Sequence, residues 1–446
     1  MFVGTSLVGC AGGGGATGKS VALPETKSVV LGAAVSRTAR TPIAHVTFVI
    51  QENRSVDNLF NGLPGADTVL NGKAPNGRKI DLQPVSLVTG WDLSHSHAAF
   101  ESDYRRGLMD GFIEAKATCN GPCAPLPPPN PAYSYVPKGE TRPYWTMATT
   151  YAFADRMFQT NAGPSFPAHE YLISGTAATD STGTYEAMDN AIAPSGPKVA
   201  GCDSPSGTLV QLIDPVTNDQ SKFAYPCFDH RTLFDALDES GVGWRYYQQN
   251  LGANLWFGPD SISHIRFGPD YANVATPSTA ILSDVSSGKL AAVSWVIPTV
   301  AESDHPAITD GSGPDWVAQV VNAVGGSQYW TNTAIFVVWD DWGGFYDHVT
   351  PQQFNNYELG FRVPLIAISP YARTGYVSHV QHEFGSLLKF TEKNFGTASV
   401  GYTDRRADDL SDMFDYAQAP TSFTPIRAAL PSARASSDTR SPDTDE

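Results

Sequence analysis

The stretch His45-Val46-Thr47-Phe48-Val49-Ile50 runs directly into Gln51-Glu52-Asn53-Arg54-Ser55, so an apolar run ends in polar residues. A second apolar run, at residues 333–339, ends in the same way in Asp340-Asp341. Near-continuous apolar runs of this length are typical of strands that are buried on both faces of a parallel sheet. Ligands bind at the carboxyl ends of the strands in open α/β sheets. The two runs therefore predict both the centre of a sheet and the edge that carries its site.

Further short β-branched runs, at residues 291–297 and 363–369, alternate with helical patterns along the chain. This alternation predicts an α/β fold with a large, central, mostly parallel sheet and flanking helices. A chain of 446 residues has the length of roughly three domains of ~150 residues, but one large α/β domain can absorb most of it.

Composition excludes several classes of protein. Charged residues make up 17% and hydrophobic residues 41%, which excludes disorder as the main state, and 40 Gly with 33 Pro exclude a coiled coil. The net charge of −16 disfavours nucleic acid as a partner, since an acidic surface repels a phosphate backbone. A locally positive site remains compatible with this balance.

The N-terminus resembles an export signal. Leu7-Val8-Gly9-Cys10 resembles a bacterial lipobox, in which Cys10 would carry a lipid anchor, although the basic region of a signal peptide is missing. The alternative is a flexible tail with a chance cysteine. No uninterrupted apolar run of about 18 residues occurs, so the mature chain is not expected to span a membrane. We expect an exported protein of the periplasm, cell envelope or extracellular space, with a leader and tether at 1–40, one large domain at 41–430 and a disordered tail at 431–446.

The other cysteines are Cys119, Cys123, Cys202 and Cys227, and four cysteines allow three pairings. Local closure favours the disulfides Cys119–Cys123 and Cys202–Cys227, which export would preserve. A zinc site is the weaker interpretation, because the spacing does not fit a zinc knuckle and no histidine pair follows.

Polar residues at the two strand ends suit a metal site. Glu52, Asn53, Asp340 and Asp341 offer three carboxylates and one amide oxygen, and such clusters bind hard or borderline divalent cations. Each residue taken alone could equally cap a helix or face solvent. The same donor set is compatible with Ca²⁺, Mg²⁺, Mn²⁺ or Zn²⁺.

Ser165 is the candidate nucleophile. It lies in Gly163-Pro164-Ser165-Phe166-Pro167, directly before an apolar run, where a helix is expected to begin. A helix N-terminus attracts anions, and a serine there beside a metal could attack phosphorus. The alternative is a simple N-cap. No G-x-S-x-G motif surrounds Ser165, so an esterase is not supported.

Histidines in polar motifs complete the candidate site. His95 and His97 lie close together, His305 follows Asp304, and His348 follows Asp347. Such side chains bind phosphoryl oxygens or protonate a leaving group. Most of the ten histidines in the chain should be structural.

Five of these motifs, in the same order across roughly residues 42–395, resemble the bacterial phosphoesterase family. The family includes non-specific phospholipases C and acid phosphatases, and it belongs to the alkaline-phosphatase-like superfamily. The motifs are 52–60 (ENRSVDNLF), 91–112 with DLSHSH, 163–167 (GPSFP), 304–306 (DHP) and 339–349 (WDDWGGFYDHV).

The resemblance implies a role for each candidate residue. Ser165 would be the nucleophile that forms a phospho-enzyme, and Glu52, Asn53, Asp340 and Asp341 would bind the metal. His95 and His305 would contact the phosphoryl group, and His348 would bind substrate. Many relatives have Asn-Arg after the proline of the nucleophile motif, whereas Ala168-His169 stands here, which would alter phosphate or head-group contacts.

These expectations lead to two hypotheses of different classes. The first is a metal-dependent phosphoesterase, with phospholipase C-type cleavage of a phosphodiester, including phospholipid, favoured over acid phosphatase action on a monoester. A sulfatase is disfavoured, since the sequence around a formylglycine precursor is absent. The second hypothesis is a lipid-anchored surface protein that kept the fold but only binds. Bound metal and hydrolysis would distinguish the first from the second.

Overall fold

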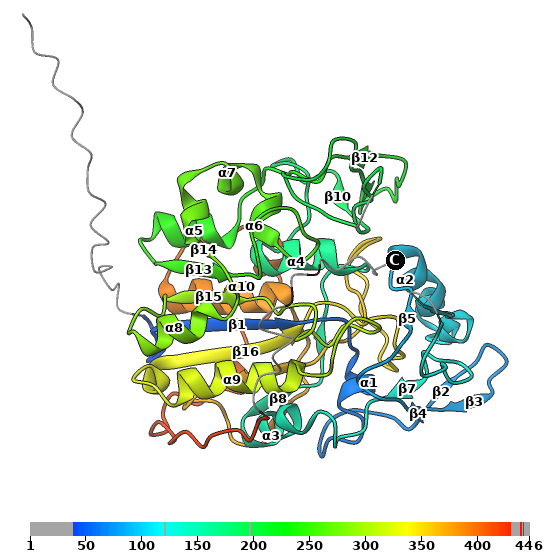
Figure 1. The fold of residues 1–446 in the computed structure, drawn as a ribbon, viewed down its shortest axis with the longest axis horizontal. Coiled ribbons are helices and arrows are strands. Elements are labelled where there is room, and N and C mark those ends of the chain that lie inside the picture. Colours follow the sequence, from blue (N-terminus) through cyan, green and yellow to red (C-terminus); the bar gives the residue numbers. More distant parts are fainter. Residues whose placement is uncertain (1–38, 120–121, 196–197, 430–437, 439, 441–446) are drawn as a thin grey trace, which may run out of the picture. The chain divides into compact units, whose positions relative to one another are not determined.

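An eight-stranded sheet forms the centre of the computed structural model, which describes residues 39–119, 122–195, 198–429, 438 and 440 (Figure 1). The strands of this sheet, in spatial order, are β14 (Val274–Ala275), β13 (Trp244–Tyr247), β15 (Val293–Val296), β1 (His45–Gln51), β16 (Thr333–Trp339), β17 (Leu365–Ile368), β8 (Ala152–Ala154) and β18 (Tyr376–Ser378). β17 pairs antiparallel with both of its neighbours, and every other pairing in the sheet is parallel. The predicted mostly parallel sheet is confirmed.

The four predicted apolar runs all form strands of this sheet. β1 and β16 lie side by side at its centre, and every residue of β16 is buried. β15 lies on the other side of β1. Only the direction of β17 differs from a uniformly parallel arrangement. Strands surrounded by other strands and covered on both faces need apolar residues at every position, which explains the unbroken runs.

Ten α-helices flank and extend the sheet. They are α1 (Val56–Leu59), α2 (His97–Tyr104), α3 (Arg142–Thr150), α4 (Ser165–Ser174), α5 (Leu233–Glu239), α6 (Gly258–Ser261), α7 (Ser263–Arg266), α8 (Ala280–Ser286), α9 (Gly313–Gly325) and α10 (Phe384–Phe395), within the described part of the chain. None of these helices is long and apolar enough to pass through a bilayer.

Aromatic contacts show that helices cover both faces of the sheet. Phe336 of β16 packs against Phe390 of α10, with ring centroids 4.9 Å apart. Trp339, three residues further along the same strand, packs against Tyr144 of α3 at 4.9 Å. Successive side chains of a strand point to opposite faces, so α10 and α3 lie on opposite faces of the sheet. The predicted flanking helices are therefore present.

Short strands form one three-stranded sheet and four two-stranded pairs beside the main sheet, within the described residues. β10 (Glu186–Ala187), β11 (Val210–Ile213) and β12 (Phe223–Ala224) form a three-stranded sheet, which we call the β10–β12 lobe (Figure 1). The remaining two-stranded pairs are β2 (Asn71–Lys73) with β3 (Lys79–Asp81), β4 (Gln83–Pro84) with β7 (Ser134–Tyr135), β5 (Asp92–Leu93) with β6 (Ala117–Thr118), and β9 (Met157–Phe158) with β19 (His382–Glu383).

Both predicted disulfides are present. Cys119 is joined to Cys123, and Cys202 is joined to Cys227. The zinc interpretation of these cysteines is therefore wrong, because each sulfur is already used in a covalent bond. Cys10, nearly all of the leader and tether at 1–40 and nearly all of the tail at 431–446 lie outside the described residues, so these expectations stay predictions.

Candidate active site

The register of the two central strands brings the first two candidate residues together. β1 and β16 pair in parallel from His45 with Thr333 to Gln51 with Trp339. The next residue on each strand is Glu52 or Asp340, so the two carboxylates leave the sheet side by side. Both side chains are fully buried. The backbone N–H of Asn53 donates to Asp340 Oδ1 at 2.9 Å, which ties the two strand ends to each other.

Asn53 lies at the centre of the site in an unusual backbone conformation. Its φ is 57°, in the left-handed region that asparagine tolerates better than most residues. Its amide nitrogen lies 3.0 Å from His95 Nε2, 3.2 Å from Asp341 Oδ2 and 3.4 Å from Ser165 Oγ. One side chain thus contacts three other candidate residues. Strained backbone of this kind concentrates at functional sites.

The glycine pair of the second strand motif makes room for Asn53. A Cβ on Gly343 would lie 2.3 Å from the carbonyl oxygen of Asn53, closer than real Cβ contacts allow. The φ of Gly343 is 62°, which also favours glycine. The loop after β16 can therefore press against the loop after β1 only because glycine stands at this position.

Ser165 begins α4, as the sequence predicted. Pro164 is the N-cap residue, and Ser165 is fully buried at the N-terminus of the helix, the end with partial positive charge. Ser165 Oγ donates to Asp341 Oδ2 at 3.1 Å. The next backbone N–H, of Phe166, donates to Asn190 Oδ1 at 2.9 Å. The hydroxyl thus has a carboxylate acceptor within hydrogen-bonding distance.

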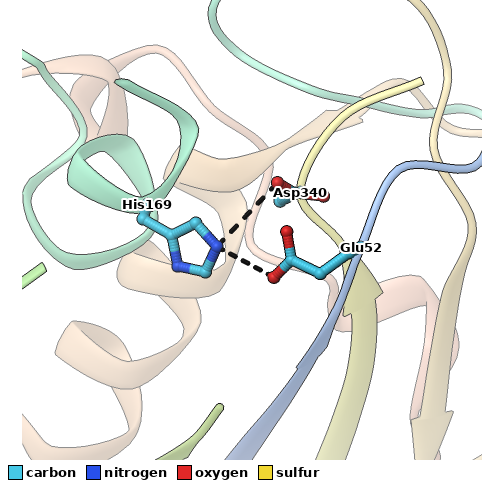
Figure 2. A group of neighbouring side chains, drawn as sticks. All are labelled: Glu52, His169 and Asp340. Atoms are coloured by element: carbon cyan, nitrogen blue, oxygen red, sulfur yellow. Dashed lines mark hydrogen bonds and ion pairs between the residues drawn. The ribbon is translucent and has the colours of Figure 1, made fainter. Parts of the chain in front are cut away.

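His169 joins the site although the sequence did not single it out as a functional residue. Figure 2 shows its ring directed at Glu52 and Asp340. Its Nε2 lies 3.1 Å from Glu52 Oε1 and 3.8 Å from Asp340 Oδ2. The signal was the spacing, because Ser165 and His169 are four residues apart in a predicted helix and such residues share a face. In the sequence, His169 is noticeable only as a departure from the family motif.

His95 and His305 lie together beside this cluster. Their ring centroids are 5.9 Å apart and both residues are fully buried. His95 Nδ1 lies 2.8 Å from the carbonyl oxygen of Leu93, and His305 Nδ1 lies 2.8 Å from the carbonyl oxygen of Pro306. Each ring is therefore oriented by its own loop.

A buried arginine holds the loop that carries His305. Arg54 donates through Nε and Nη2 to the carbonyl oxygen of Asp304, at 2.9 and 2.7 Å. The Asp304 carboxyl accepts from Tyr144 and Trp339. Burial lowers the pKa of Arg54 to about 10 and raises the pKa of Asp304 to about 6. Arg54 remains charged at neutral pH, so this part of the motif serves to position the loop.

His348 lies in a different cluster. Its Nδ1 is 2.6 Å from Asp57 Oδ2, its Nε2 is 3.1 Å from Asp67 Oδ1, and the guanidinium of Arg362 lies beside it. Within the described part of the chain, the hydrogen bonds and ion pairs of His348 are made with Asp57, Asp67 and Arg362, and not with Ser165 or the strand-end carboxylates. Its role in substrate binding therefore stays a prediction.

The donor set at the strand ends fits a divalent cation. Asn53 Oδ1 and Asp340 Oδ2 are buried and have no hydrogen-bond partner among the described residues. Glu52, His169 and Asp340 each offer a ligand atom, and these atoms lie within 4.8 Å of one another. Buried oxygen atoms without partners are costly unless a ligand satisfies them. Carboxylate, amide and imidazole donors suit several divalent metals.

Comparisons with known proteins show which proteins this chain resembles. Phospholipase C A of Mycobacterium tuberculosis (strain CDC 1551 / Oshkosh) is 24% identical over an alignment of 449 positions. That alignment covers 86% of this chain and 79% of that protein. Non-specific phospholipase C1 of Arabidopsis thaliana is 26% identical over an alignment of 416 positions, which covers 82% of this chain and 69% of that protein. Among solved structures, a protein in the alkaline phosphatase superfamily from Vibrio parahaemolyticus aligns with a TM-score of 0.36, 12% identity and coverage of 84% of this chain and 72% of that one. At that score the alignment adds nothing to the fold described above.

The family model covers nearly the whole described chain. It matches residues 43–398, which include all eight predicted site residues. The prediction of a phosphoric ester hydrolase is thereby confirmed, since the model describes phosphoesterases. This chain belongs to the Phosphoesterase family.

Proposed function

We propose that this protein is a metal-dependent phosphoesterase that cleaves phosphodiesters by a phospholipase C-type reaction through a phospho-serine. The observation that carries the proposal is the hydrogen bond from Ser165 Oγ to Asp341 Oδ2, at 3.1 Å, at the N-terminus of α4. Similarity to proteins named phospholipase C, from a bacterium and from a plant, supports the choice of a diester.

The proposed metal ligands are Glu52, Asn53, Asp340 and Asp341, with His169 as an addition from the structure. When bound there, a divalent cation supplies positive charge that offsets the carboxylates and lowers the pKa of a nearby hydroxyl. Such a cation, together with the N-terminus of α4, would offset most of the negative charge of the three carboxylates, which would reduce the repulsion between this acidic site and an anionic substrate.

In the first step, Ser165 Oγ attacks phosphorus and its proton passes to Asp341 Oδ2, the nearest acceptor. The new bond is Oγ–P, and the bond that breaks joins phosphorus to the oxygen of the leaving alcohol, which takes a proton from solvent water. His95 and His305 face the phosphoryl oxygens and stabilise the charge that develops on them. In the second step, water attacks phosphorus and gives up one proton to solvent, and the P–Oγ bond breaks. Ser165 Oγ takes back the proton from Asp341, and the phosphorylated head group is released. The helix N-terminus favours the anion in both steps.

The test is the Ser165→Ala variant, assayed on a chromogenic phosphodiester and on the matching monoester. We expect turnover to fall to background with an unchanged thermal unfolding midpoint. Ser286→Ala, which changes a serine at the exposed end of α8, should keep full activity. Full activity of Ser165→Ala would refute the role of this residue. Faster hydrolysis of the monoester by the unmodified protein would instead favour an acid phosphatase, and absence of both hydrolysis and bound metal would favour a binding protein.

Export is part of the proposal. Disulfides persist in oxidising compartments, and this chain has two. The described structure therefore fits an exported enzyme whose phosphoester substrate, including phospholipid, lies outside the cytoplasm. Lipidation of Cys10 would add an anchor, which mass spectrometry of the purified protein can test.

A further inference from the structure

A cavity of about 460 Å³ lies between the β10–β12 lobe and the start of α2. Its lining includes the apolar side chains of Ile192, Leu209 and Phe223 and the polar or charged side chains of Ser96, Asp189, Asn190 and Lys198. None of these residues belongs to the family motifs described above except Ser96, which lies within the DLSHSH segment. The cavity therefore lies outside the catalytic cluster but shares one motif with it.

Two of the lining residues connect the cavity directly to the catalytic residues. Asn190 accepts a hydrogen bond from the backbone N–H of Phe166, the residue after Ser165. Ser96 follows His95 in the chain, and its hydroxyl accepts from Ala99 N to cap α2. The cavity wall is thus one residue away from the proposed nucleophile on one side and from a phosphoryl-contacting histidine on the other.

The chemistry of the lining changes from the buried end to the open end. Asn190, at the catalytic side, is only 5% exposed. The apolar side chains are far more exposed, with 66% for Ile192, 47% for Leu209 and 58% for Phe223. Asn190 thus stands near Ser165, and three large apolar side chains together with the partly exposed Lys198 line the more open part. Clusters of exposed apolar residues beside a cleft mark sites where apolar ligands bind.

We propose that this cavity binds the alkyl or acyl chain of the leaving alcohol in a phosphodiester substrate. The inference rests on the proposed function, because it places the phosphorus atom at Ser165. With the phosphoryl group there, a chain attached to the leaving oxygen follows the change from polar to apolar lining and covers Ile192, Leu209 and Phe223. A small polar phosphomonoester would leave these three side chains in water. The structure therefore favours an amphiphilic substrate.

The first experiment uses the unmodified protein and a series of phosphodiesters that share one polar head group and differ in the alkyl chain of the leaving alcohol, from ethyl to octyl, below their aggregation concentrations. Turnover is measured as release of the phosphorylated head group. We expect kcat/KM to rise with chain length, by up to about fourfold for each methylene that the cavity buries. An alkyl series with constant kcat/KM would overturn the proposal, even though the shared hydrolysis would leave the proposed function intact. If the unmodified protein hydrolysed none of these diesters, the proposed function itself would be refuted.

The second experiment compares Phe223→Ser and Leu209→Ser with Val216→Ser. Val216 is 84% exposed in the same lobe but does not line the cavity, so it is a matched control. We expect each cavity variant to lower kcat/KM for the octyl diester about tenfold and to leave the ethyl diester unchanged. Equal losses for both diesters, or no loss for either, would contradict the proposal.

A binding measurement separates substrate affinity from catalysis. The thermal midpoint of each variant shows whether a substitution has disturbed the fold. Octyl and ethyl phosphodiesters are titrated into Ser165→Ala, with and without Phe223→Ser, and the thermal midpoint of each protein is recorded. Tighter binding of the octyl ester that is lost with Phe223→Ser supports the cavity as its site. Equal affinity for both esters in Ser165→Ala would overturn it.

Discussion

Ser165 and His169 lie one helical turn apart on α4, and each reaches a different strand end of the central sheet. Ser165 Oγ donates to Asp341 Oδ2 at 3.1 Å, whereas His169 Nε2 lies 3.1 Å from Glu52 Oε1. A single helix therefore presents both the proposed nucleophile and a proposed additional metal ligand. Residues four apart share a helix face, so the position of one side chain determines the position of the other.

His169 is expected to contribute to metal affinity. The His169→Ala variant should weaken binding of Mn²⁺ or Zn²⁺ about 10- to 100-fold, measured by calorimetry on the metal-free protein. His379→Ala is the control, because His379 is 57% exposed and pairs with Asp155 instead. Unchanged metal affinity in His169→Ala would contradict a ligand role.

Replacements of Asn53 should separate its side chain from its backbone. Asn53→Gly keeps the left-handed conformation and removes the amide, so activity should fall about 10- to 100-fold with little change in stability. Asn53→Ala should lose the same activity and in addition about 1 kcal/mol of unfolding free energy, because alanine is strained at this φ. Urea unfolding beside the diester assay checks both. If the glycine variant kept its activity, the amide would have no role in the reaction.

Gly343→Ala should destabilise the protein more than Gly62→Ala. Both glycines have positive φ, but a Cβ on Gly62 meets nothing within 4 Å, whereas a Cβ on Gly343 would lie 2.3 Å from the Asn53 carbonyl oxygen. Gly62→Ala should cost about 1 kcal/mol of unfolding free energy from backbone strain alone. Gly343→Ala adds the steric clash and should also reduce activity, because Asn53 must move. Equal costs would show that the loop relaxes freely.

Stability should fall as the pH rises because of Glu186. Burial, and next the charge of Glu358, raise the pKa of Glu186 from 4.5 to about 8. The folded state therefore holds a proton that the unfolded state releases between these values, so stability is full below pH 4.5 and is lost towards pH 8. The loss is at most about 5 kcal/mol, since one pKa unit corresponds to about 1.4 kcal/mol.

The Glu186→Gln variant should remove this pH dependence, as measured by urea unfolding at several pH values. Glu239→Gln is the control, because the pKa of Glu239 is lowered by its hydrogen bond with Arg231. The pH-dependent contribution of Glu239 to the free energy of unfolding therefore changes only at more acidic pH. An unchanged slope in Glu186→Gln would mean that another group binds the proton. Because the Tyr171 hydroxyl of α4 lies within hydrogen-bonding distance of both Glu186 and Glu358, this cluster also supports the helix that carries Ser165.

The two disulfides should differ in their contribution to stability. Cys202 and Cys227 are 25 residues apart in sequence, whereas Cys119 and Cys123 are 4 apart. A longer closed loop restricts the unfolded chain more, so replacing the first pair by serines should cost about 3.5 kcal/mol and the second about 2 kcal/mol. Thermal unfolding of the two double variants tests this order. A larger loss from the short loop would contradict the entropic explanation.

Much of the fold and part of the site could be predicted because their signals are local. Residues 45–50 and 333–339 are apolar at every position apart from His45 and two threonines, and they form β1 and β16. Ser165 was placed at a helix start by the prolines around it, and α4 begins there. These features depend on neighbours in the sequence, so local patterns are enough to predict them.

The position of His348 shows where local patterns stop being informative. It lies in the same motif as Asp340 and Asp341, yet its side chain pairs with Asp57 and Asp67. Nothing in the motif indicates which way each side chain points. The antiparallel direction of β17 is a similar case, because a short apolar run carries no direction.

The sequence by itself determined the α/β class, the central strands, the start of α4 and the candidate residues at the strand ends. Only the tertiary structure decided the register that places Glu52 beside Asp340, the entry of His169 into that pair and the cavity beside Ser165. The physical reason is distance along the chain. Hydrophobic periodicity and helix capping act between near neighbours, whereas this site is made by packing residues that are 42 to 288 positions apart, such as Asn53 with His95 and Asn53 with Asp341.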